Sequence, residues 1–298
     1  MADLPDQGSQ LPGLAGGAGG SPAVAHACRP LRLYWWNGKE NFGDRLSADV
    51  VAHVSKRAVE WAPEAEAELF AVGSILTQVR QALIRRERRE AGPWIWGSGV
   101  MAPLRTDFLE KVRIAALRGP LSVALLDLPD LPMGDPGLLA AEALGARPPA
   151  SGLIGLVLHM SQRLSPQIEA RIRADGRFRL INVRDPDHMA VVAAIGGCRH
   201  VISSSLHGLI VADSFGVPNT WLDASNIHKC AGLKFHDYAI SVGRLLGRPM
   251  PIEAIFNLAD TLPERPPELA YAAELSRTTE ALRAAFPAEL MADVRAVA

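Results

Sequence analysis

The segment Ser203-Ser204-Ser205-Leu206-His207-Gly208 combines three hydroxyl groups with a histidine at the end of an apolar run. The apolar stretch LIVADSFGVP comes next, which indicates that a strand turns into a helix here. Backbone N–H groups at a helix start, serine hydroxyls and an imidazole can together bind a phosphate or a carboxylate. The positive helix end lowers the pKa of His207, and a bound anion would restore it and prepare His207 as an acid. The alternative is that His207 and the serines only cap the helix.

Arg118-Gly119-Pro120 is a second candidate anion site, because it places a cation at a strand end just before a proline that favours a helix start. The alternative is a surface arginine that pairs with a nearby acid such as Asp127. Arg184 ends the predicted strand RFRLINVR and is a further candidate ligand for an anion. His159 ends the run GLVLH and is either solvated or at the edge of a cleft.

Short polar loops follow the other predicted strands. In Asn41-Phe42-Gly43-Asp44, either Asp44 only caps the next helix, or the loop faces a cleft and contacts an acceptor sugar, where carboxylate and amide groups bind sugar hydroxyls. Glycine lets backbone N–H groups approach a ligand closely, which makes two Gly-Ser turns candidate ligand contacts. The turn residues assigned to an acceptor site or the cleft are Asn41, Gly43, Gly73, Ser74, Ser98 and Asp135, the last with a purely structural turn as its alternative.

Two further groups of residues have open or structural interpretations. Asp187 is expected to cap the helix that follows it. The polar residues after Asp223 either supply cations to the cleft or are solvated; they are His228, Lys229, Lys234 and His236.

Strand and helix patterns alternate along the chain and position these residues. Apolar strands are expected at 31–36, 68–76, 93–100, 111–120, 152–160, 177–184, 200–208 and 219–224. Helices are expected at 41–58, 135–144, 165–176, 185–197, 207–218 and 234–247, with one or two more after Glu264. Such alternation predicts parallel sheets covered by helices on both faces, with ligands beyond the carboxyl ends of the strands.

The Pro-rich joint at 147–152 divides this pattern into two Rossmann-like domains. We therefore expect a flexible tail at 1–30, an N-terminal domain at 31–148 on the acceptor side, a C-terminal domain at 149–262 on the donor side, and C-terminal helices at 263–298.

Composition excludes several classes of protein. The 298 residues carry 31 Lys and Arg against 32 Asp and Glu, so the basic excess of a nucleic-acid partner is missing. Three scattered cysteines favour a reducing compartment and give no zinc pattern, so we expect no metal. No apolar run approaches the roughly 20 residues of a membrane helix, and we expect a cytoplasmic protein. GxGxxG and P-loop motifs are missing, which disfavours a dinucleotide or P-loop site.

The motifs NFGD, AVGSIL, WGSG, ALRGPLS, GDPGLL and SSSLHGLIVADSFGVP, in this order, resemble the polysaccharide pyruvyl transferases, most of all those of the succinoglycan and xanthan type. The resemblance covers about residues 31–238. It implies a fold of two Rossmann-like domains like that of GT-B glycosyltransferases. It also implies phosphoenolpyruvate as co-substrate with no cofactor, and a lipid-linked or polymeric saccharide as acceptor. Such an acceptor brings peripheral contact with the inner membrane face and with polysaccharide assembly proteins. By motif, Arg118 and His207 correspond to donor-site residues.

Ketal formation would then need an acid at the methylene carbon and a base at the sugar hydroxyl, for which His207 and Asp44 are the candidates. Arg118, Arg184 and the three serines, Ser203, Ser204 and Ser205, would bind the anionic donor. Two alternatives remain. One is a sugar-nucleotide glycosyltransferase of the GT-B type, in which Asp213 would be the nearest acid to the nucleotide ribose. The other is a catalytically silent sugar-binding partner in polysaccharide assembly.

Overall fold

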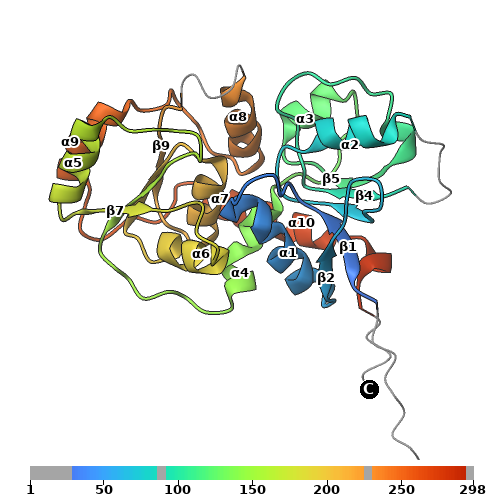
Figure 1. The fold of residues 1–298 in the computed structure, drawn as a ribbon, viewed down its shortest axis with the longest axis horizontal. Helices are drawn as coiled ribbons and strands as arrows, with labels where there is room; N and C mark the ends of the chain where they lie inside the picture. The colour runs from blue at the N-terminus through green and yellow to red at the C-terminus, as the bar shows by residue number, and fades with distance from the viewer. Residues whose placement is uncertain (1–28, 86–91, 225–229, 293–298) are drawn as a thin grey trace, which may run out of the picture. The chain divides into compact units, whose positions relative to one another are not determined.

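The computed structural model describes residues 29–85, 92–224 and 230–292. Almost all of the expected tail at 1–30 therefore lies outside the described residues. Arg29–Ala292 forms one compact unit that contains two separate parallel sheets (Figure 1). The predicted α/β class is confirmed, whereas the division into two GT-B-like domains at 148/149 stays a prediction.

The first sheet has the strand order β2-β1-β3-β4-β5. Its strands are β1 (Leu31–Tyr34), β2 (Val59–Trp61), β3 (Leu69–Phe70), β4 (Trp94–Trp96) and β5 (Arg113–Ala116). Successive side chains of a strand point to opposite faces, so Leu33 and Tyr34 belong to different hydrophobic clusters. Tyr34 packs with α2 (Leu76–Leu83) and α3 (Pro120–Leu125), and Leu33 packs with α1 (Phe42–Ser55).

The second sheet has the order β7-β6-β8-β9. Its strands are β6 (Ile154–Val157), β7 (Phe178–Ile181), β8 (His200–Ser203) and β9 (Asn219–Trp221). Every residue of β6 and β8 is buried, as expected for central parallel strands covered on both faces. The covering helices are α5 (Pro166–Ala174) and α9 (Ile255–Thr261) on one face and α6 (His188–Gly196) and α7 (Leu206–Ser214) on the other.

One hydrophobic cluster runs through both halves of the chain and explains why they form a single compact unit. It contains Val50 of α1, Val157 of β6 and Val192 of α6, all fully buried. Between the sheets lie the short helices η2 (Pro136–Leu139) and α4 (Ala140–Leu144), which contact both α1 and α7. Helix α8 (Ala231–Ser241) contacts α3 of the first half, and the two helices stand side by side in Figure 1.

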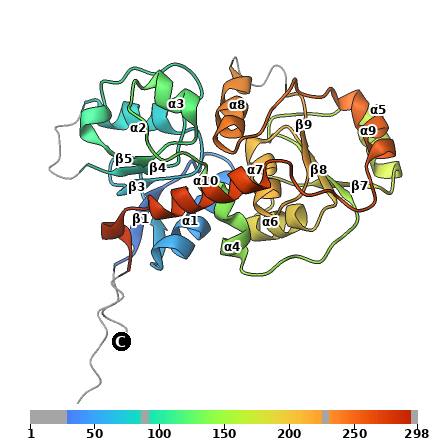
Figure 2. The ribbon, with the colours of Figure 1, turned by 180° about the vertical axis from the view of Figure 1, so that it is seen from behind.

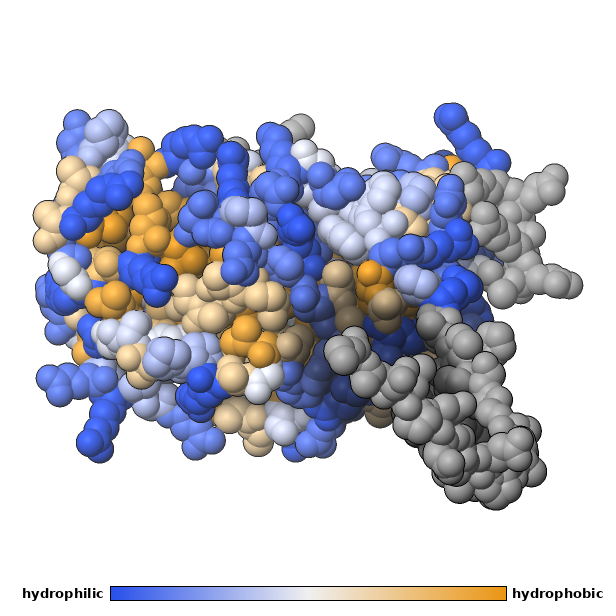
Figure 3. Space-filling model, turned by 60° about the horizontal axis from the view of Figure 1, so that its bottom comes forward, coloured by the Kyte–Doolittle hydropathy of each residue, from blue (hydrophilic) through white to orange (hydrophobic). Residues whose placement is uncertain are grey.

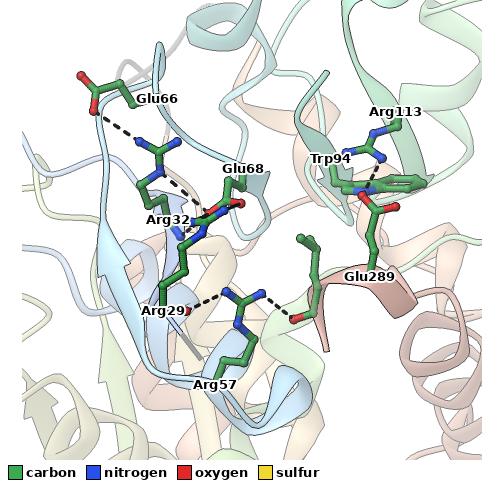
Figure 4. Close-up of polar contacts among 9 residues, drawn as sticks. Arg29, Arg32, Arg57, Glu66, Glu68, Trp94, Arg113 and Glu289 are labelled. Carbon is green, nitrogen blue, oxygen red and sulfur yellow. Dashed lines mark hydrogen bonds and ion pairs between the residues drawn. The ribbon is translucent and has the colours of Figure 1, made fainter. Parts of the chain in front are cut away.

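The last described part of the chain returns to the first sheet. Figure 2 shows α10 (Ala272–Ala284, red) running between α7 and the first sheet. Trp96 of β4 donates from Nε1 to the carbonyl of Leu282 at 2.8 Å, and its ring meets Phe286 edge-on. Beyond α10, Glu289 accepts hydrogen bonds from Trp94 and Arg113 (Figure 4). The remaining short helices are η1 (Leu109–Lys111), η3 (Ile252–Ala254) and η4 (Ala288–Leu290).

Arg57 joins both ends of the described chain at this place. Its guanidinium donates to the carbonyls of Arg29 and Leu290, while Arg29 forms an ion pair with Glu68 (Figure 4). The C-terminal segment is therefore part of the first half's packing.

The structure differs from the expected elements around residue 56. Helix α1 ends at Ser55 because Lys56 adopts a left-handed conformation with φ 57°, and the next residues form the edge strand β2 instead of a longer helix. Helices α2 and α9 were also missed, since neither has a strong cap signal.

The surface is mixed in polarity. On the face shown in Figure 3, apolar side chains gather over one part of the molecule while polar side chains cover most of the rest. Within the described residues, no helix has the length and apolar character that crossing a membrane requires.

The packing of α10 is testable by removing one of its anchors. Leu282 is 0% exposed, so Leu282→Ala should lower the free energy of unfolding by about 2–5 kcal/mol. Leu245 is 100% exposed, and Leu245→Ala should change the free energy of unfolding by less than about 0.5 kcal/mol. Urea unfolding of both variants checks this; equal midpoints would show that α10 is not part of the core.

Candidate functional site

A cavity of about 290 Å³ opens at the carboxyl ends of both sheets. Its lining residues follow β1, β3, β4, β6 and β8, which is where ligands bind in open α/β sheets. Helix α8 contributes one further side chain. The lining residues are Trp36, Lys39, Asn41, Asp44, Gly73, Ser74, Ile75, Gln78, Met101, His159, Met160, Ser161, Ser205, Leu206, His207 and Lys234.

His207 lies in the first turn of α7 and lines the cavity. Its ring packs directly against Gly43, where a Cβ atom would lie 1.9 Å from Nδ1, so only glycine fits at position 43. Nε2 is buried, and the described residues offer it no hydrogen-bond partner. Burial first, and then the positive charges of Lys234 and Arg118, lower the pKa of His207 to about 3. The imidazole is therefore neutral at pH 7.

The three serines have different surroundings. Ser205 is the N-cap residue of α7, but its side chain makes no capping hydrogen bond and lines the cavity. Ser203 is buried, and its one hydroxyl proton lies within reach of the carbonyls of Val157 and Ser205, at 2.9 and 2.8 Å from Oγ. Ser204 accepts from the backbone N–H of His159 at 2.9 Å. Ser203 and Ser204 thus hold the loops after β6 and β8, and of the three only Ser205 reaches the cavity.

The start of α1 decides against one of the two interpretations of Asp44, because the N-cap is Asn41 and not Asp44. The side chain of Asn41 accepts from the N–H of Gly43 and donates to Asp44 Oδ2. Asp44 lies in the first helical turn and lines the cavity although only 9% of it is exposed. Burial raises its pKa to about 6, against the opposing effects of the Asn41 hydrogen bond and the charge of Lys234.

Arg118 lies behind the cavity wall and is 0% exposed. Its partner is Asp237 of α8 and not Asp127, with Nε and Nη2 each 3.0 Å from Asp237 Oδ2. The other donors bind the carbonyl of Val100 and the hydroxyl of Ser74, which lines the cavity. Arg118 is therefore no surface residue, and its role as a ligand of the donor stays a prediction.

Two glycines admit this ion pair. A Cβ atom on Gly99 would lie 2.4 Å from the Arg118 guanidinium carbon, and one on Gly119 would lie 1.9 Å from the carbonyl oxygen of Asp237. The WGSG and RGP motifs therefore make room for an arginine and for a neighbouring helix.

The remaining predicted residues divide between the cavity and its supports. Gly73 and His159 line the cavity. Ser98 is buried and donates to the Gly73 carbonyl at 2.8 Å. Asp135 is fully buried and caps η2, and burial raises its pKa to about 6. Arg184 is exposed and donates to the carbonyl of Met160.

Two further carboxylates have clear structural partners. Asp187 caps α6, which confirms that expectation. Asp213 is buried and accepts hydrogen bonds from Tyr238, Tyr271 and Asn219, and it does not line the cavity.

Sequence patterns did not assign Trp36 and Gln78 to the site, and they left Lys234 open between a cation of the cleft and a solvated residue. Lys234 lies on α8, at the first position of the helix expected from the sequence, and is only 8% exposed. His236 packs its ring against Trp221, while His228 and Lys229 lie outside the described residues. The signal for Lys234 is its spacing of three residues from Asp237, which places both on one helix face.

A family model described as "Polysaccharide pyruvyl transferase" matches residues 40–226, more than half of the chain. The chain belongs to the polysaccharide pyruvyl transferase family. The resemblance of the sequence motifs is thereby confirmed. The family match includes Asn41, Asp44 and His207 but ends before Lys234.

Two curated proteins are similar to this chain in sequence. "Succinoglycan biosynthesis protein ExoV" of Rhizobium meliloti (strain 1021) is 28% identical over 224 residues, covering 72% of this chain and 65% of its own length. "Uncharacterized protein L143" of Acanthamoeba polyphaga mimivirus is 27% identical over 122 residues, covering 40% of this chain and 42% of its own. The chain therefore spans less than two thirds of either relative. A crystal structure of a functionally uncharacterized Klebsiella pneumoniae protein covers 71% of this chain and 87% of its own, with 12% identity and a TM-score of 0.45.

The raised pKa of Asp44 predicts that this residue lowers stability. As pH rises, the unfolded chain releases the proton first, near its usual pKa of 3.8, and the folded protein releases it only near about 6. Stability is therefore lost between about pH 4 and pH 6 and stays lost above that range. Asp44→Asn should raise the free energy of unfolding by about 3 kcal/mol at about pH 7.5 and by only about 1 kcal/mol at about pH 4.5.

Urea unfolding at both pH values measures this gain. Asp130→Asn, at an exposed site away from the cavity, is the matched control and should change stability by less than about 0.5 kcal/mol. A gain from Asp44→Asn that is independent of pH would contradict the prediction.

Proposed function

We propose that this chain transfers a pyruvyl group from phosphoenolpyruvate to a sugar of an exopolysaccharide or another cell-surface glycan, forming a pyruvate ketal. The observation that carries the proposal is one cavity that joins His207, whose buried Nε2 has no partner among the described residues, with the buried side chains of Asp44 and Lys234. Membership of the family and the name of the Rhizobium relative support the acceptor class.

The cavity suits an anion that carries both a carboxylate and a phosphate. Helix α7 begins beside the cavity at Leu206, the side chain of its N-cap Ser205 makes no capping hydrogen bond, and a helix start favours negative charge. Charge-assisted hydrogen bonds in such an enclosed site are stronger than neutral ones. The donor would therefore bind on the α7 side, and the acceptor hydroxyls on the α1 side near Asn41 and Asp44.

The proposed reaction needs one acid and one base. A proton from His207 goes to the methylene carbon of phosphoenolpyruvate, and C2 becomes oxocarbenium-like. A sugar hydroxyl attacks C2 and gives its proton to Asp44. The C2–O bond to phosphate breaks, a second hydroxyl closes the ring, and its proton leaves with the phosphate. The overall products are the ketal and inorganic phosphate, so no oxidant or reductant is required.

The protonation states set the order of events. His207 without a bound anion is neutral at pH 7, so it becomes an acid only after the negative charge of the donor raises its pKa. Asp44, with a pKa of about 6, is mostly ionised at pH 7 and can accept a proton. Binding of the donor would thus prepare the acid before the acceptor reacts.

The acceptor we propose is a lipid-linked or polymeric saccharide with two neighbouring hydroxyls, which would place the reaction at the cytoplasmic face of the membrane. The direct test is incubation with phosphoenolpyruvate and a lipid-linked exopolysaccharide repeat unit, followed by mass analysis of the saccharide and measurement of released phosphate. Equal amounts of pyruvylated product and phosphate are expected. Phosphate release without a change in saccharide mass would contradict the proposed pyruvyl transfer.

His207→Gln should lower the saturated rate of transfer about 10²–10⁴-fold, the usual contribution of a general acid, because glutamine keeps a donor group but delivers no proton. The affinity for phosphoenolpyruvate should fall much less than the rate. His53→Gln is the matched control, since His53 pairs with Glu142 at the surface and should leave the rate unchanged. A folded His207→Gln protein that loses donor affinity but keeps its saturated rate would make His207 a binding residue only.

A further inference from the structure

Trp61 lies at the carboxyl end of the edge strand β2, outside the cavity, and is 41% exposed. A single exposed apolar side chain is common on protein surfaces. Two features set Trp61 apart, which are its restrained ring and its place beside the cavity. The indole N–H donates to the carbonyl of Trp35 at 3.0 Å. This hydrogen bond restrains the ring, while much of its surface stays in contact with water.

Trp35 connects Trp61 to the cavity. It follows β1, which pairs in parallel with β2, so Trp35 and Trp61 both lie at the carboxyl edge of the first sheet. The next residue, Trp36, lines the cavity. The ring of Trp36 covers Gly38, where a Cβ atom would lie 2.8 Å from its Cζ2 atom. One restrained tryptophan ring therefore belongs to the cavity wall, and a second lies at the edge of the sheet next to it.

The size of the cavity leaves part of a polymeric acceptor outside it. The cavity measures about 290 Å³, at the lower end of the about 300–1,000 Å³ that is typical of small-molecule sites. It has to hold the donor and the sugar that reacts, so the neighbouring sugars of an acceptor chain lie against the surface around the cavity. We placed the acceptor on the α1 side, and β2 packs against α1 (Figure 1). That surface therefore includes Trp61.

The chemistry around Trp61 suits a sugar better than a membrane. One face of a sugar ring consists mainly of C–H groups, which are attracted to the electron-rich face of an aromatic ring. The segment 59–68 around Trp61 contains four glutamates and no lysine or arginine, and Arg29 and Arg32 pair with only two of these glutamates. Anionic lipids repel such an acidic segment, whereas carboxylates accept hydrogen bonds from sugar hydroxyls.

We propose that Trp61 forms a second saccharide subsite, outside the cavity, on which a sugar ring of the acceptor chain next to the reacting sugar stacks. This inference rests on the proposed function and deepens it, because it concerns the length of the acceptor. A single sugar in the cavity does not reach Trp61, but an oligosaccharide does. The subsite therefore favours longer acceptors.

Titration calorimetry with saccharides of different length tests this subsite. The probes are oligosaccharides of succinoglycan freed of pyruvyl groups, and the methyl glycosides of their component sugars. The wild type should bind the oligosaccharides about three- to tenfold more tightly than the best methyl glycoside, the usual contribution of one aromatic contact. Trp61→Ala should lose this gain with length. Its affinity for the methyl glycoside and for phosphoenolpyruvate should stay unchanged, since neither ligand reaches position 61.

Further variants separate the aromatic face from apolar bulk. Trp61→Phe keeps an aromatic ring and should retain most of the gain, whereas Trp61→Leu is apolar without such a face and should lose it. If Trp61→Ala does not fold, the difference between these two variants decides. Leu180→Ala is the matched control, because Leu180 is 38% exposed on β7, the edge strand of the second sheet, and does not line the cavity. It should bind like the wild type.

The outcomes separate this subsite from the proposed function. A folded Trp61→Ala protein that keeps the gain with length would contradict the subsite, and so would an equal loss of affinity for the methyl glycoside or phosphoenolpyruvate, which indicates a structural role. If the wild type binds all saccharides equally, the subsite is wrong, and pyruvyl transfer to the single sugar would still support the proposed function. If the wild type neither binds nor pyruvylates any of them, both proposals fail.

Two other occupants of this surface give different results. Flotation with vesicles of phosphatidylcholine and phosphatidylglycerol measures membrane binding, and analytical ultracentrifugation measures association of two copies. If Trp61→Ala loses either of these but keeps the gain with saccharide length, Trp61 contacts a membrane or a second copy, and the saccharide subsite is wrong.

Discussion

The site depends on one buried ion pair, that of Arg118 and Asp237. Both side chains are 0% exposed, and each nitrogen of the guanidinium group has a partner from Asp237, Ser74 or Val100. Removing one member of such a pair leaves a buried charge and typically costs about 3–5 kcal/mol. Since Arg118 follows β5 and Asp237 belongs to α8, 119 residues later, this pair holds α8 against the first half of the chain.

Close backbone approaches allow the other elements to meet around the cavity. Gly119 admits the carbonyl of Asp237, Gly99 admits the guanidinium group, and Gly43 admits the ring of His207. In each case a Cβ atom would lie within 2.4 Å of a neighbouring atom. These glycines belong to the motifs NFGD, WGSG and ALRGPLS, which carry the family resemblance. In each motif the glycine leaves room for a side chain or backbone of another segment of the chain.

The fold disfavours the charged forms of several ionisable groups of the cavity, compared with the same groups in water. Burial raises the pKa of Asp44 and lowers the pKa values of His207 and Lys234. His207 Nε2 is buried with no partner among the described residues. The hydrophobic cluster that runs from α1 through β6 to α6 offsets these costs. Perturbed groups gathered at strand ends are typical of functional sites, where a ligand supplies the missing partner.

The sequence by itself determined the α/β class, most strands and the family, because apolar periodicity and short motifs are local properties. It also assigned to the site seven residues that line the cavity, because strand ends in parallel sheets meet at one edge. They are Asn41, Asp44, Gly73, Ser74, His159, Ser205 and His207.

Only the tertiary structure decided which polar side chains reach the cavity. Arg118, Ser203 and Ser204 are not among the lining residues; Arg118 is paired with Asp237, Ser203 donates to the Val157 carbonyl and Ser204 accepts from the His159 N–H. The partner of Arg118 lies 119 residues away, and Lys234 becomes part of the site only because that partner docks its helix. Long-range pairing of this kind leaves no periodic trace in a single sequence, since it depends on which helix face the packing buries.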